Sequence, residues 1–441
     1  DILPTNQVTI DDIEEESRVI DGVHEVAGHL YDELQYNTLL PNKRYSNILK
    51  ELVLCRISNP SSKNASSKIL RRYYMKDHDL DAIYRTMDHV FSKIDDIQKA
   101  TFTATNSLFS GALEVVLFDV TTLHFESTVK DDLRKFGYSK NFRFNTTQVV
   151  LALATNSDGL PIGYELFEGN KAEVKTLIET IANWKSKFAI GNVCFIGDRA
   201  MFSEDNLVQL EALGYNYIVA AKLRSLPSVM QDKIMQEDKY IEHTTSENIV
   251  KTAAFTYQPE DIRLLEENKA NKAKITKYQK SIEQYKNRKF VVSHSAKRAR
   301  KDAKQRQILL DKIEKQLDQT SNSAKLISNS AIKKFTSNEG KSQSYIDQSK
   351  IDLDAKWDGF HGVITNIKET TDGGSTTNEY IINQYKRLVK IEDCFRVNKT
   401  TLKMRPIYHF KPERIQAHIA VCYMAFSVLR QLEYRIKLQK K

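Results

Sequence analysis

A change in hydrophobic periodicity at Leu113 constrains the fold of this 441-residue chain more than any other feature. Before it, residues 1 to 112 place apolar side chains at three- and four-residue steps, as in RYSNILKELVLCRI (44–57), which predicts short amphipathic helices. From Leu113, the run LEVVLFDVTTLHFES is rich in β-branched and aromatic residues. Such a run is typical of a buried central strand. We therefore predict a helical N-terminal region followed by a sheet.

The segments after this strand alternate between strand and helix patterns. The turn Asn156–Gly159 separates two apolar runs and predicts an antiparallel hairpin. In chain order, the predicted elements are strands at 148–155 and 161–170, a helix at 172–188, a strand at 192–200, a helix that ends at Gly214 and a strand at 215–223. Three strands, helix, strand, helix, strand is the order of an RNase H-like mixed sheet flanked by helices. We predict this α/β fold, with the first part of its core at residues 113–223.

Residues 224–356 are polar and rich in charge, and we predict an insertion domain that does not continue the sheet. Residues 261–318 favour two basic helices on either side of FVVSH (290–294). Their basic cluster would either neutralise phosphates or form a solvated helix face. The second part of the core is predicted at 357–441, with a strand at 357–366, a helix at 378–396 and a last helix at 412–438.

Two predicted strands each carry an aspartate near the C-terminal end of the apolar run, Asp119 in VVLFDVTT and Asp198 in VCFIGDRA. A single aspartate there is more often a turn or capping residue. In an RNase H-like sheet, however, these two strands lie side by side, and two close carboxylates repel one another unless a cation lies between them. Hard oxygen ligands suit Mg²⁺ or Mn²⁺. Glu392, on the helix 378–396, is the candidate third ligand, and its alternative interpretation is an exposed surface acid.

Composition limits the remaining classes. The net charge of +9 would attract polyanions, although a solvated basic surface explains it equally well. The four cysteines are far apart and indicate neither a zinc module nor a disulfide framework. Without a long apolar run or a signal pattern, we expect a cytoplasmic protein with no membrane partner. The chain opens with Asp1 and not Met, which leaves a preceding N-terminal segment open.

The segment YKRLVKIEDCFRVNK (385–399) resembles the Tyr-x2-Arg-x3-Glu-x6-Lys signature of bacterial insertion-sequence transposases of the DDE class. Tyr385, Glu392 and Lys399 match, whereas Leu388 takes the arginine position and Arg387 precedes it. Further similar segments are FDVTTLHFES, GYSKNFRFNTTQVVLALATNSDGLPIGYELFEGN, IGDRAMFSEDNL and RPIYHFKPERIQAHIAVCYMAF. Together they span most of 113–223 and 357–430.

This resemblance implies a DNA transposase that hydrolyses phosphodiester bonds at the ends of an insertion element and joins the freed 3′-hydroxyl to target DNA. Asp119, Asp198 and Glu392 would hold two Mg²⁺ or Mn²⁺ ions. The residues expected to contact DNA are Tyr385, Arg387, Arg396 and Lys399. The partners implied are double-stranded terminal repeats, target DNA and a second copy of the chain in a synaptic homodimer in the bacterial nucleoid. Residues 1–112 would serve as a helical scaffold or bind DNA ends.

Two alternatives stay open at this point. A metal-dependent nuclease or resolvase would cut DNA without joining it, and a cleavage-inactive descendant of a transposase would only bind DNA. His124, His361 and His409 have no spacing to another metal ligand, so we expect core or surface roles for them. The sequence has no Gly-rich phosphate loop of the Walker type, which argues against nucleotide hydrolysis as the energy source.

Overall fold

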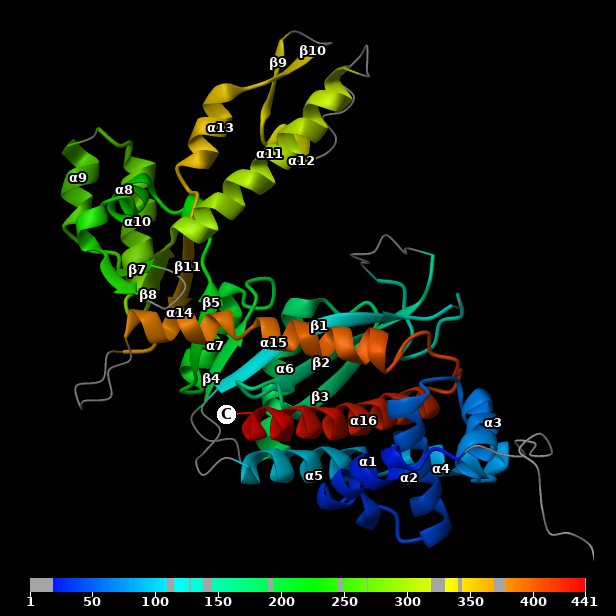
Figure 1. Cartoon of the computed structure of the whole chain (residues 1–441). Helices are drawn as coiled ribbons and strands as arrows, with labels where there is room; N and C mark the ends of the chain where they lie inside the picture. Colours follow the sequence, from blue (N-terminus) through cyan, green and yellow to red (C-terminus); the bar gives the residue numbers. More distant parts are fainter. Residues whose placement is uncertain are drawn as a thin grey trace, which may run out of the picture. The chain divides into compact units, whose positions relative to one another are not determined.

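The computed structural model describes residues 19–108, 115–126, 128–137, 145–188, 193–244, 249–267, 269–318, 330–339, 343–368 and 377–440. The predicted strand start at Leu113 lies outside these residues. Two compact units divide the chain (Figure 1). Unit 1 comprises Asp1–Tyr215 and Arg387–Lys441, and unit 2 comprises Asn216–Lys386. The four-part domain division of the sequence analysis stays a prediction.

The N-terminal helices of unit 1 surround the last helix of the chain. They are α1 (Gly22–Glu33), α2 (Lys43–Ser58), α3 (Lys63–Tyr74), α4 (Leu80–Phe91) and α5 (Ile94–Ser107). The long helix α16 (Pro412–Gln439) packs against α1, α2, α4 and α5, and its side chains are buried almost without interruption from Ile415 to Val428. Because α16 is apolar on all sides over this stretch, it forms the centre of a helical core.

The strands of unit 1 are β1 (Val115–His124), β2 (Gln148–Thr155), β3 (Pro161–Glu168) and β4 (Cys194–Gly197), in the order β3-β2-β1-β4. The first three pair antiparallel, and β1 pairs parallel with β4. Helices α6 (Thr176–Lys187) and α7 (Glu204–Ala212) flank β4 in the chain. This mixed sheet with flanking helices confirms the predicted RNase H-like order.

The two faces of this sheet are covered by different helices. Phe118 of β1 meets Trp184 of α6, with ring centroids 6.0 Å apart. Neighbouring residues of a strand point to opposite faces, so Asp119 faces away from α6. The register aligns Asp119 with Leu153 of β2 and Leu153 with Tyr164 of β3, whose ring contacts Tyr423 of α16 at 4.8 Å. Asp119 therefore lies on the face that α16 and α15 (Val389–Arg396) cover (Figure 1).

Unit 2 contains a second set of paired strands, in the order β5-β11-β8-β7-β6. Their bounds are β5 (Asn216–Ala220), β6 (Ile241–Thr244), β7 (Ile249–Phe255), β8 (Lys289–His294) and β11 (Phe360–Thr365), and all their pairings are antiparallel. β6, β7 and β8 lie within residues 224–356 and share a sheet with β5 and β11, which were predicted as strands of the core. The expectation that residues 224–356 do not continue the sheet is therefore wrong. β8, the run around FVVSH, pairs along its whole length with β11. Short strands between long charged helices leave only weak sequence signals.

The helices of unit 2 lie around and beyond these strands (Figure 1). They are α8 (Ser228–Ile234), α9 (Asp261–Glu267), α10 (Lys272–Gln284), α11 (Ala296–Asp318), α12 (Ser330–Lys333), α13 (Gln348–Ala355) and α14 (Asn378–Lys386). The predicted helix pair on either side of β8 corresponds to α10 and α11. A hairpin of β9 (Thr336–Glu339) and β10 (Gln343–Ile346) packs with α11 around Ile313, Ile332 and Phe335.

The predicted continuous helix 378–396 is two helices. α14 ends at Lys386 and α15 begins at Val389, because the amides of Lys390 and Ile391 bond to carbonyls three residues back instead of four. Such tightened turns are compatible with any ordinary residue. The junction contains neither Gly nor Pro, so the sequence gives no sign of it. None of the helices in the described parts of the chain has the length and apolar character needed to cross a bilayer.

Candidate active site

Asp119 lies within β1, and Asp198 directly follows β4, the strand that pairs with β1. The parallel register pairs Val115 with Cys194 and Leu117 with Ile196. Continued by two residues, this register aligns Asp119 with Asp198, at an inter-strand spacing of about 4.8 Å. Asp119 is half-buried and Asp198 is exposed. The predicted adjacency of the first and fourth strands is thus confirmed, and the convergence of the two carboxylates stays a prediction.

Gly197 explains how β4 comes so close to β1 immediately before Asp198. A Cβ atom at position 197 would lie 2.9 Å from the carbonyl oxygen of Phe118 and 2.5 Å from a ring carbon of Phe202. A side chain there would push the two strands apart, because real Cβ atoms do not approach backbone oxygen so closely. Glycine at 197 therefore allows β4 to lie close to β1 at the point where Asp119 and Asp198 follow.

Helix α15 runs along β1 in the same direction and carries Glu392. In its second half, the Cys394 thiol donates a hydrogen bond to the carbonyl of Gly159 at 3.5 Å, in the turn after β2 that lies near the beginning of β1. Further on, the Lys399 ammonium donates a hydrogen bond to Thr121 Oγ1. Glu392 precedes Lys399 by about two helical turns, so both lie on the same flank of this segment. Glu392 is exposed and Lys399 is half-buried.

Lys399 belongs to a short π-helix, Val397–Thr401, that continues α15. The buried Asn398 side chain donates a hydrogen bond to the carbonyl of Cys394 at 2.9 Å, which gives that carbonyl a side-chain partner where the helix widens. The Lys399 ammonium also lies 5.5 Å from the ring centre of Phe395. These contacts hold the lysine on the face of β1 that carries Asp119, because Asp119 and Thr121 are two residues apart in one strand.

Asp393, next to Glu392, fastens α15 to α16. Arg430 of α16 is only 9% exposed and donates to Asp393 Oδ2 at 2.8 Å. Arg396 binds the other oxygen of the same carboxylate from an exposed position. Burial opposes ionisation of Asp393, but the hydrogen bonds from Arg430 and Arg396 outweigh it and hold the pKa of Asp393 below its usual range. The ion pair thereby fixes the backbone that presents Glu392.

The carboxylates supply the donor set that hard divalent cations prefer, all oxygen and partly open to solvent. In the described residues, however, no group of three or more His, Cys, Asp or Glu side chains is close enough together to hold a metal ion. The structure thus has Asp119 in β1, Asp198 directly after β4 and Glu392 on the helix that packs against β1, without a closed three-acid cage in the described residues. The donor chemistry of this pair fits a divalent cation.

The other predicted DNA-contacting residues are distributed over both units. Tyr385 belongs to unit 2, where its ring lies 5.1 Å from that of His361. Arg387 and Arg396 are exposed in unit 1, and Leu388 is 9% exposed and contributes to the core. Because the helix is interrupted between Tyr385 and Glu392, the predicted single face from Tyr385 to Lys399 is not continuous.

The sequence analysis did not identify Thr121, Gly197 or Arg430 as contributors to the site. The sequence could have indicated Thr121, since it follows Asp119 by two residues and must share its face of the strand. It could also have indicated Gly197, because glycine within a buried strand marks a close approach of another backbone. The contact of Arg430 with Asp393 depends on how α16 packs, and no local pattern indicates it.

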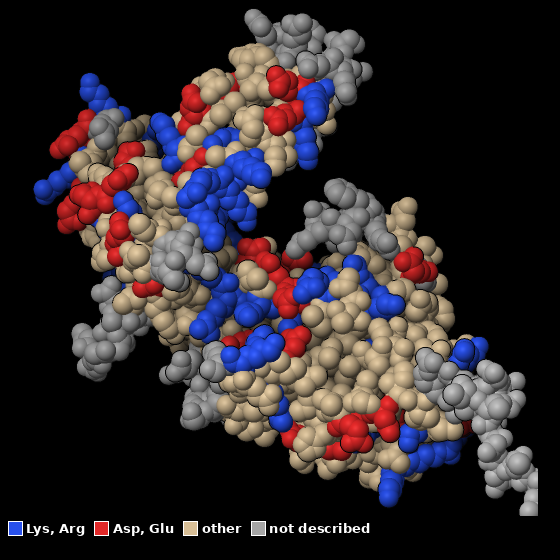
Figure 2. Space-filling view, in the orientation of Figure 1, with Lys and Arg blue, Asp and Glu red and all other residues tan. Residues whose placement is uncertain are grey.

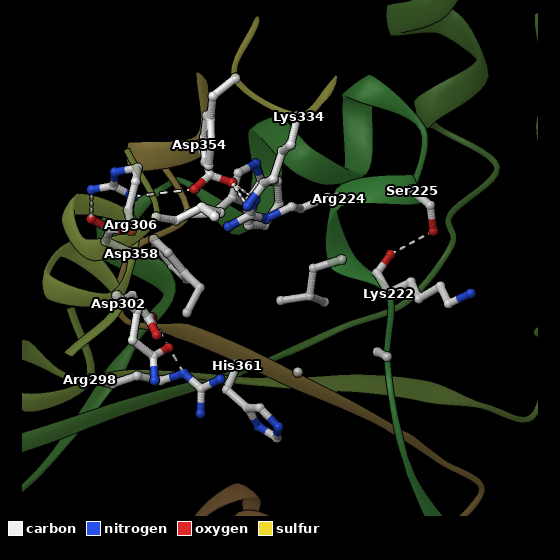
Figure 3. Close-up of a pocket in the computed structure, with 18 residues that line it drawn as sticks. Lys222, Arg224, Ser225, Arg298, Asp302, Arg306, Lys334, Asp354, Asp358 and His361 are labelled. Atoms are coloured by element: carbon white, nitrogen blue, oxygen red, sulfur yellow. Dashed lines mark hydrogen bonds and ion pairs between the residues drawn. The ribbon is translucent and has the colours of Figure 1, made fainter. Parts of the chain in front are cut away.

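Unit 2 contains a separate cavity of about 620 Å³ with none of the three predicted acids in its wall (Figure 3). Asp354, 8% exposed, is its central charge and pairs with Arg224, with Arg306 at 3.3 Å and with Lys334 at 2.8 Å. Arg306 also binds Asp358, with its Nη1 2.7 Å from Oδ1. Charges from four parts of unit 2 thus neutralise one another, which indicates a structural ion-pair network.

The β3-β2-β1-β4 order, with β1 parallel to β4 and helices on the sheet, defines a fold of the RNase H-like class. Residues 110–427 match the family model described as "Transposase DDE domain", and the chain belongs to this family of DDE-domain transposases. No curated protein matches the chain.

Two solved transposase structures are similar to it. One is a piggyBac transposase synaptic complex with hairpin DNA, at 7% identity and a TM-score of 0.43, covering 96% of this chain and 74% of that one. The other is a Mos1 transposase paired-end complex with left transposon end, at 14% identity and a TM-score of 0.18, covering 40% of this chain and 59% of that one.

Proposed function

We propose that this DDE-domain transposase cuts and joins phosphodiester bonds at the ends of an insertion element in bacterial DNA, with Asp119, Asp198 and Glu392 as catalytic residues. One observation carries the proposal. The parallel register of β1 and β4, continued past the end of β4, would align the two aspartates within the part of the chain that matches the family. Two carboxylates that close are unfavourable unless a cation shares them, which supports a metal-dependent reaction over a purely structural role.

Each residue of the site has a separate task in this proposal. Asp119 and Asp198 would hold Mg²⁺ or Mn²⁺, two ions in all, and Glu392 would complete the set. Bound there, two such ions would activate the attacking oxygen and stabilise the leaving one. Water is the first attacking group, and the 3′-hydroxyl that it frees is the second. Lys399 sits beside Thr121 on the same face of β1, where its charge would hold a DNA phosphate next to the acids.

Basic residues beyond the acids would hold the rest of the DNA. We assign Tyr385, Arg387 and Arg396 to phosphate contacts near the cleaved bond. In unit 2, Lys and Arg side chains gather along the first half of α11 (Figure 2). Its exposed basic residues are Lys297, Arg298, Arg300, Lys301 and Lys304. Contacts of this kind fix position and not sequence, so they suit both the terminal repeats and the target.

Two copies of the chain would act together on the paired DNA ends, because synapsis couples cutting to the presence of both ends. Sedimentation of the protein with DNA that carries the terminal repeats should show two chains with two ends. A complex of one chain with two ends would contradict this part of the proposal.

The decisive experiment is cleavage of DNA carrying the element's terminal repeats, with Mg²⁺ or Mn²⁺, by the wild type and by Glu392→Gln. The exposed acid Asp205, seven residues after Asp198, supplies the matched control Asp205→Asn. We expect the wild type and the control to cut and join, and Glu392→Gln to bind without cutting. Cutting without joining would identify a nuclease or resolvase. Binding without cutting under either metal would identify a DNA-binding protein that has lost its chemistry.

A further inference from the structure

Between the π-helix and α16, buried and exposed side chains alternate in two short stretches, which the half-buried Arg405 and the exposed Pro406 separate. Leu402, Met404, Ile407 and His409 are buried, at 0%, 2%, 5% and 8% exposure. Between and after them, two large aromatic side chains point outward, Tyr408 at 61% and Phe410 at 70% exposure, together with the exposed Lys403 and Lys411. We call Lys403, Tyr408, Phe410 and Lys411 the outer row. One side of the segment is therefore packed into the core, and the outer row lies on the other.

The buried half holds this segment in place through polar contacts. The Met404 amide donates to the carbonyl of Asn398 at 2.9 Å, and its own carbonyl accepts from His418 Nε2 of α16 at 3.0 Å. Arg56 of α2 donates to the carbonyl of Leu402 at 3.4 Å. Because the backbone is anchored from two helices, the two aromatic rings are presented at fixed positions and not on a free loop.

The outer row extends along the strand that carries Asp119. Near its start, Lys399 binds Thr121 in the middle of β1. Near its end, the Phe410 ring lies 6.0 Å from the Arg134 guanidinium, which also lies 5.6 Å from the ring of Phe125, the residue that follows β1. From Asp119 to Phe125 is six residues, or about 20 Å of strand. This length corresponds to about six nucleotides of one DNA strand at about 3.4 Å each.

The Phe410 ring has the Arg134 guanidinium on one side and is otherwise exposed to solvent. Arg134 is 4% exposed and its Nε binds Asp131 Oδ2 at 2.6 Å, so the guanidinium beside the Phe410 ring is itself fixed. The ring is nevertheless 70% exposed. Single exposed apolar residues are ordinary, but two aromatic rings two residues apart on an anchored backbone form a surface suited to stacking.

The positive charges around these rings indicate the kind of partner that they bind. Lys403 and Lys411 of the outer row and the half-buried Arg405 are positive, and the nearby Arg414 is already engaged by Asp88 at 2.8 and 2.9 Å. Interleaved cations and aromatic rings fit a nucleic acid strand, whose phosphates meet the cations while its bases stack on the rings. In a continuous duplex, neighbouring base pairs cover the faces of each base. The rings therefore require bases that are not stacked within a duplex.

We propose that the outer row is a binding site for unpaired bases of a DNA strand, within about six nucleotides of the bond held at the acids, with Tyr408 and Phe410 stacking on the bases and Lys403 and Lys411 contacting phosphates. The inference deepens the proposed function and rests on it for DNA as the substrate. It gives the protein a preference for melted or single-stranded DNA beside its cutting site, in addition to duplex contacts.

The test compares binding of a 20-nucleotide single-stranded oligonucleotide with binding of the matching duplex, by fluorescence anisotropy at fixed salt. We expect the Tyr408→Ala/Phe410→Ala variant to bind the single strand at least about tenfold more weakly and the duplex within about twofold of the wild type. Tyr408→Phe keeps the ring and should bind normally. Tyr345→Ala, which removes another exposed tyrosine at 48% exposure, serves as the matched control.

The same variants exclude the competing interpretation, in which the rings contact a second copy of the chain. If the double variant changes the sedimentation of the protein without DNA, the outer row is a protein interface and the proposal fails. It also fails if single-strand and duplex affinities fall equally, or if neither changes. Circular dichroism confirms folding of the variant, as expected for two exposed side chains.

Binding and cutting are measured separately, so the two proposals can fail independently. Loss of single-strand binding in the double variant, in a protein that never cuts, would overturn the proposed chemistry and leave the base-stacking site. Normal single-strand binding by the double variant, in a protein that cuts and joins, would overturn only the base-stacking site.

Discussion

Lys399 and Thr121 are 278 residues apart in the chain, yet the lysine ammonium donates a hydrogen bond to the threonine hydroxyl. Thr121 follows Asp119 by two residues, and Lys399 follows Glu392 by seven. The bond therefore joins the strand of one predicted catalytic acid to the helical segment of another. It places a cation at the site before any DNA is present.

We predict that Lys399→Ala lowers the rate of DNA cleavage about 10- to 100-fold, because a hydrogen bond from a charged group contributes about 1.5 to 3 kcal/mol. Loss of one phosphate contact should also reduce the salt dependence of DNA binding by about one unit of slope. Lys437→Ala, an exposed lysine in the last turn of α16, is the control and should change neither. Equal effects of both substitutions would indicate nonspecific charge attraction instead.

Removal of divalent ions should abolish cleavage and leave DNA binding largely intact. In the proposal, the carboxylates need the ions for chemistry, whereas Lys and Arg side chains bind the phosphates. Chelation with EDTA followed by addition of Mg²⁺ or Mn²⁺ should restore cutting by the wild type but not by Asp119→Asn or Asp198→Asn. Cleavage that persists in EDTA would rule out the metal-dependent mechanism.

Arg430→Met should destabilise unit 1 by about 1 to 3 kcal/mol, because it leaves the Asp393 carboxylate without its buried partner. Arg396→Ala removes the exposed partner of the same carboxylate and should cost less than about 0.5 kcal/mol. Urea unfolding followed by the fluorescence of Trp184, the tryptophan of unit 1, distinguishes the two. The pKa of Asp393 is lowered on folding, so its contribution is present above its unfolded pKa of about 3.9 and is lost as the pH falls further.

Asp354→Asn should lower the stability of unit 2 by roughly 3 kcal/mol, since it removes the buried carboxylate that pairs with Arg224, Arg306 and Lys334. Trp357, the tryptophan of unit 2, lies in the same cavity wall and reports the transition. Asp352→Asn, an exposed residue of the same helix, should leave the midpoint unchanged. Equal midpoints for both variants would show that the network contributes nothing to stability.

Acid should destabilise unit 1 through His409. Burial, together with the nearby positive charges of Lys63, Arg414 and Arg56, lowers the pKa of His409 to about 3. The unfolded chain, with a pKa of about 6.5, then binds one more proton than the folded chain as the pH falls from 6.5 towards 3. Stability is therefore full above pH 6.5 and decreases by at most about 1.4 kcal/mol per pH unit below it.

His409→Phe should make the free energy of unfolding less dependent on pH between 6.5 and 4.5, measured by urea unfolding at several pH values. His418, buried beside it, has a lowered pKa for the same main reason, so some dependence should remain. His29, whose side chain is 72% exposed, provides the control His29→Gln. An unchanged slope in His409→Phe would mean that His409 is protonated equally in both states.

The core strands could be predicted from the sequence because their signals are local. The β-branched run around Asp119 and the hairpin turn at Asn156–Gly159 fix elements whose pairing follows from short connections. The pairing of β1 with β4, the strands next to Asp119 and Asp198, followed from the order of those elements. The RNase H-like class was accessible for this reason, and residues 110–427 match the DDE transposase family.

The features that the sequence did not predict depend on contacts between distant segments. Strands β6 and β7 are short and partly exposed, so their membership in a sheet depends on β8 and β11. The junction between α14 and α15 is made by a change in hydrogen-bond spacing at ordinary residues. The contact between Arg430 and Asp393 requires α16 to lie beside α15. The roles of Asp119, Asp198 and Glu392 stay predictions until cleavage is measured.

Between Leu402 and Phe410, neighbouring residues are under two different constraints: the buried ones are constrained by folding, and the exposed aromatic ones by the proposed DNA binding. Substitutions at Met404, Ile407 or His409 disturb the packed interior, so they should reduce the yield of folded protein. Substitutions at Tyr408 or Phe410 leave the interior intact and should yield abundant, well-folded protein. A saturation library across these nine positions, scored once for expression and once for DNA binding, would therefore separate into two interleaved sets of sites.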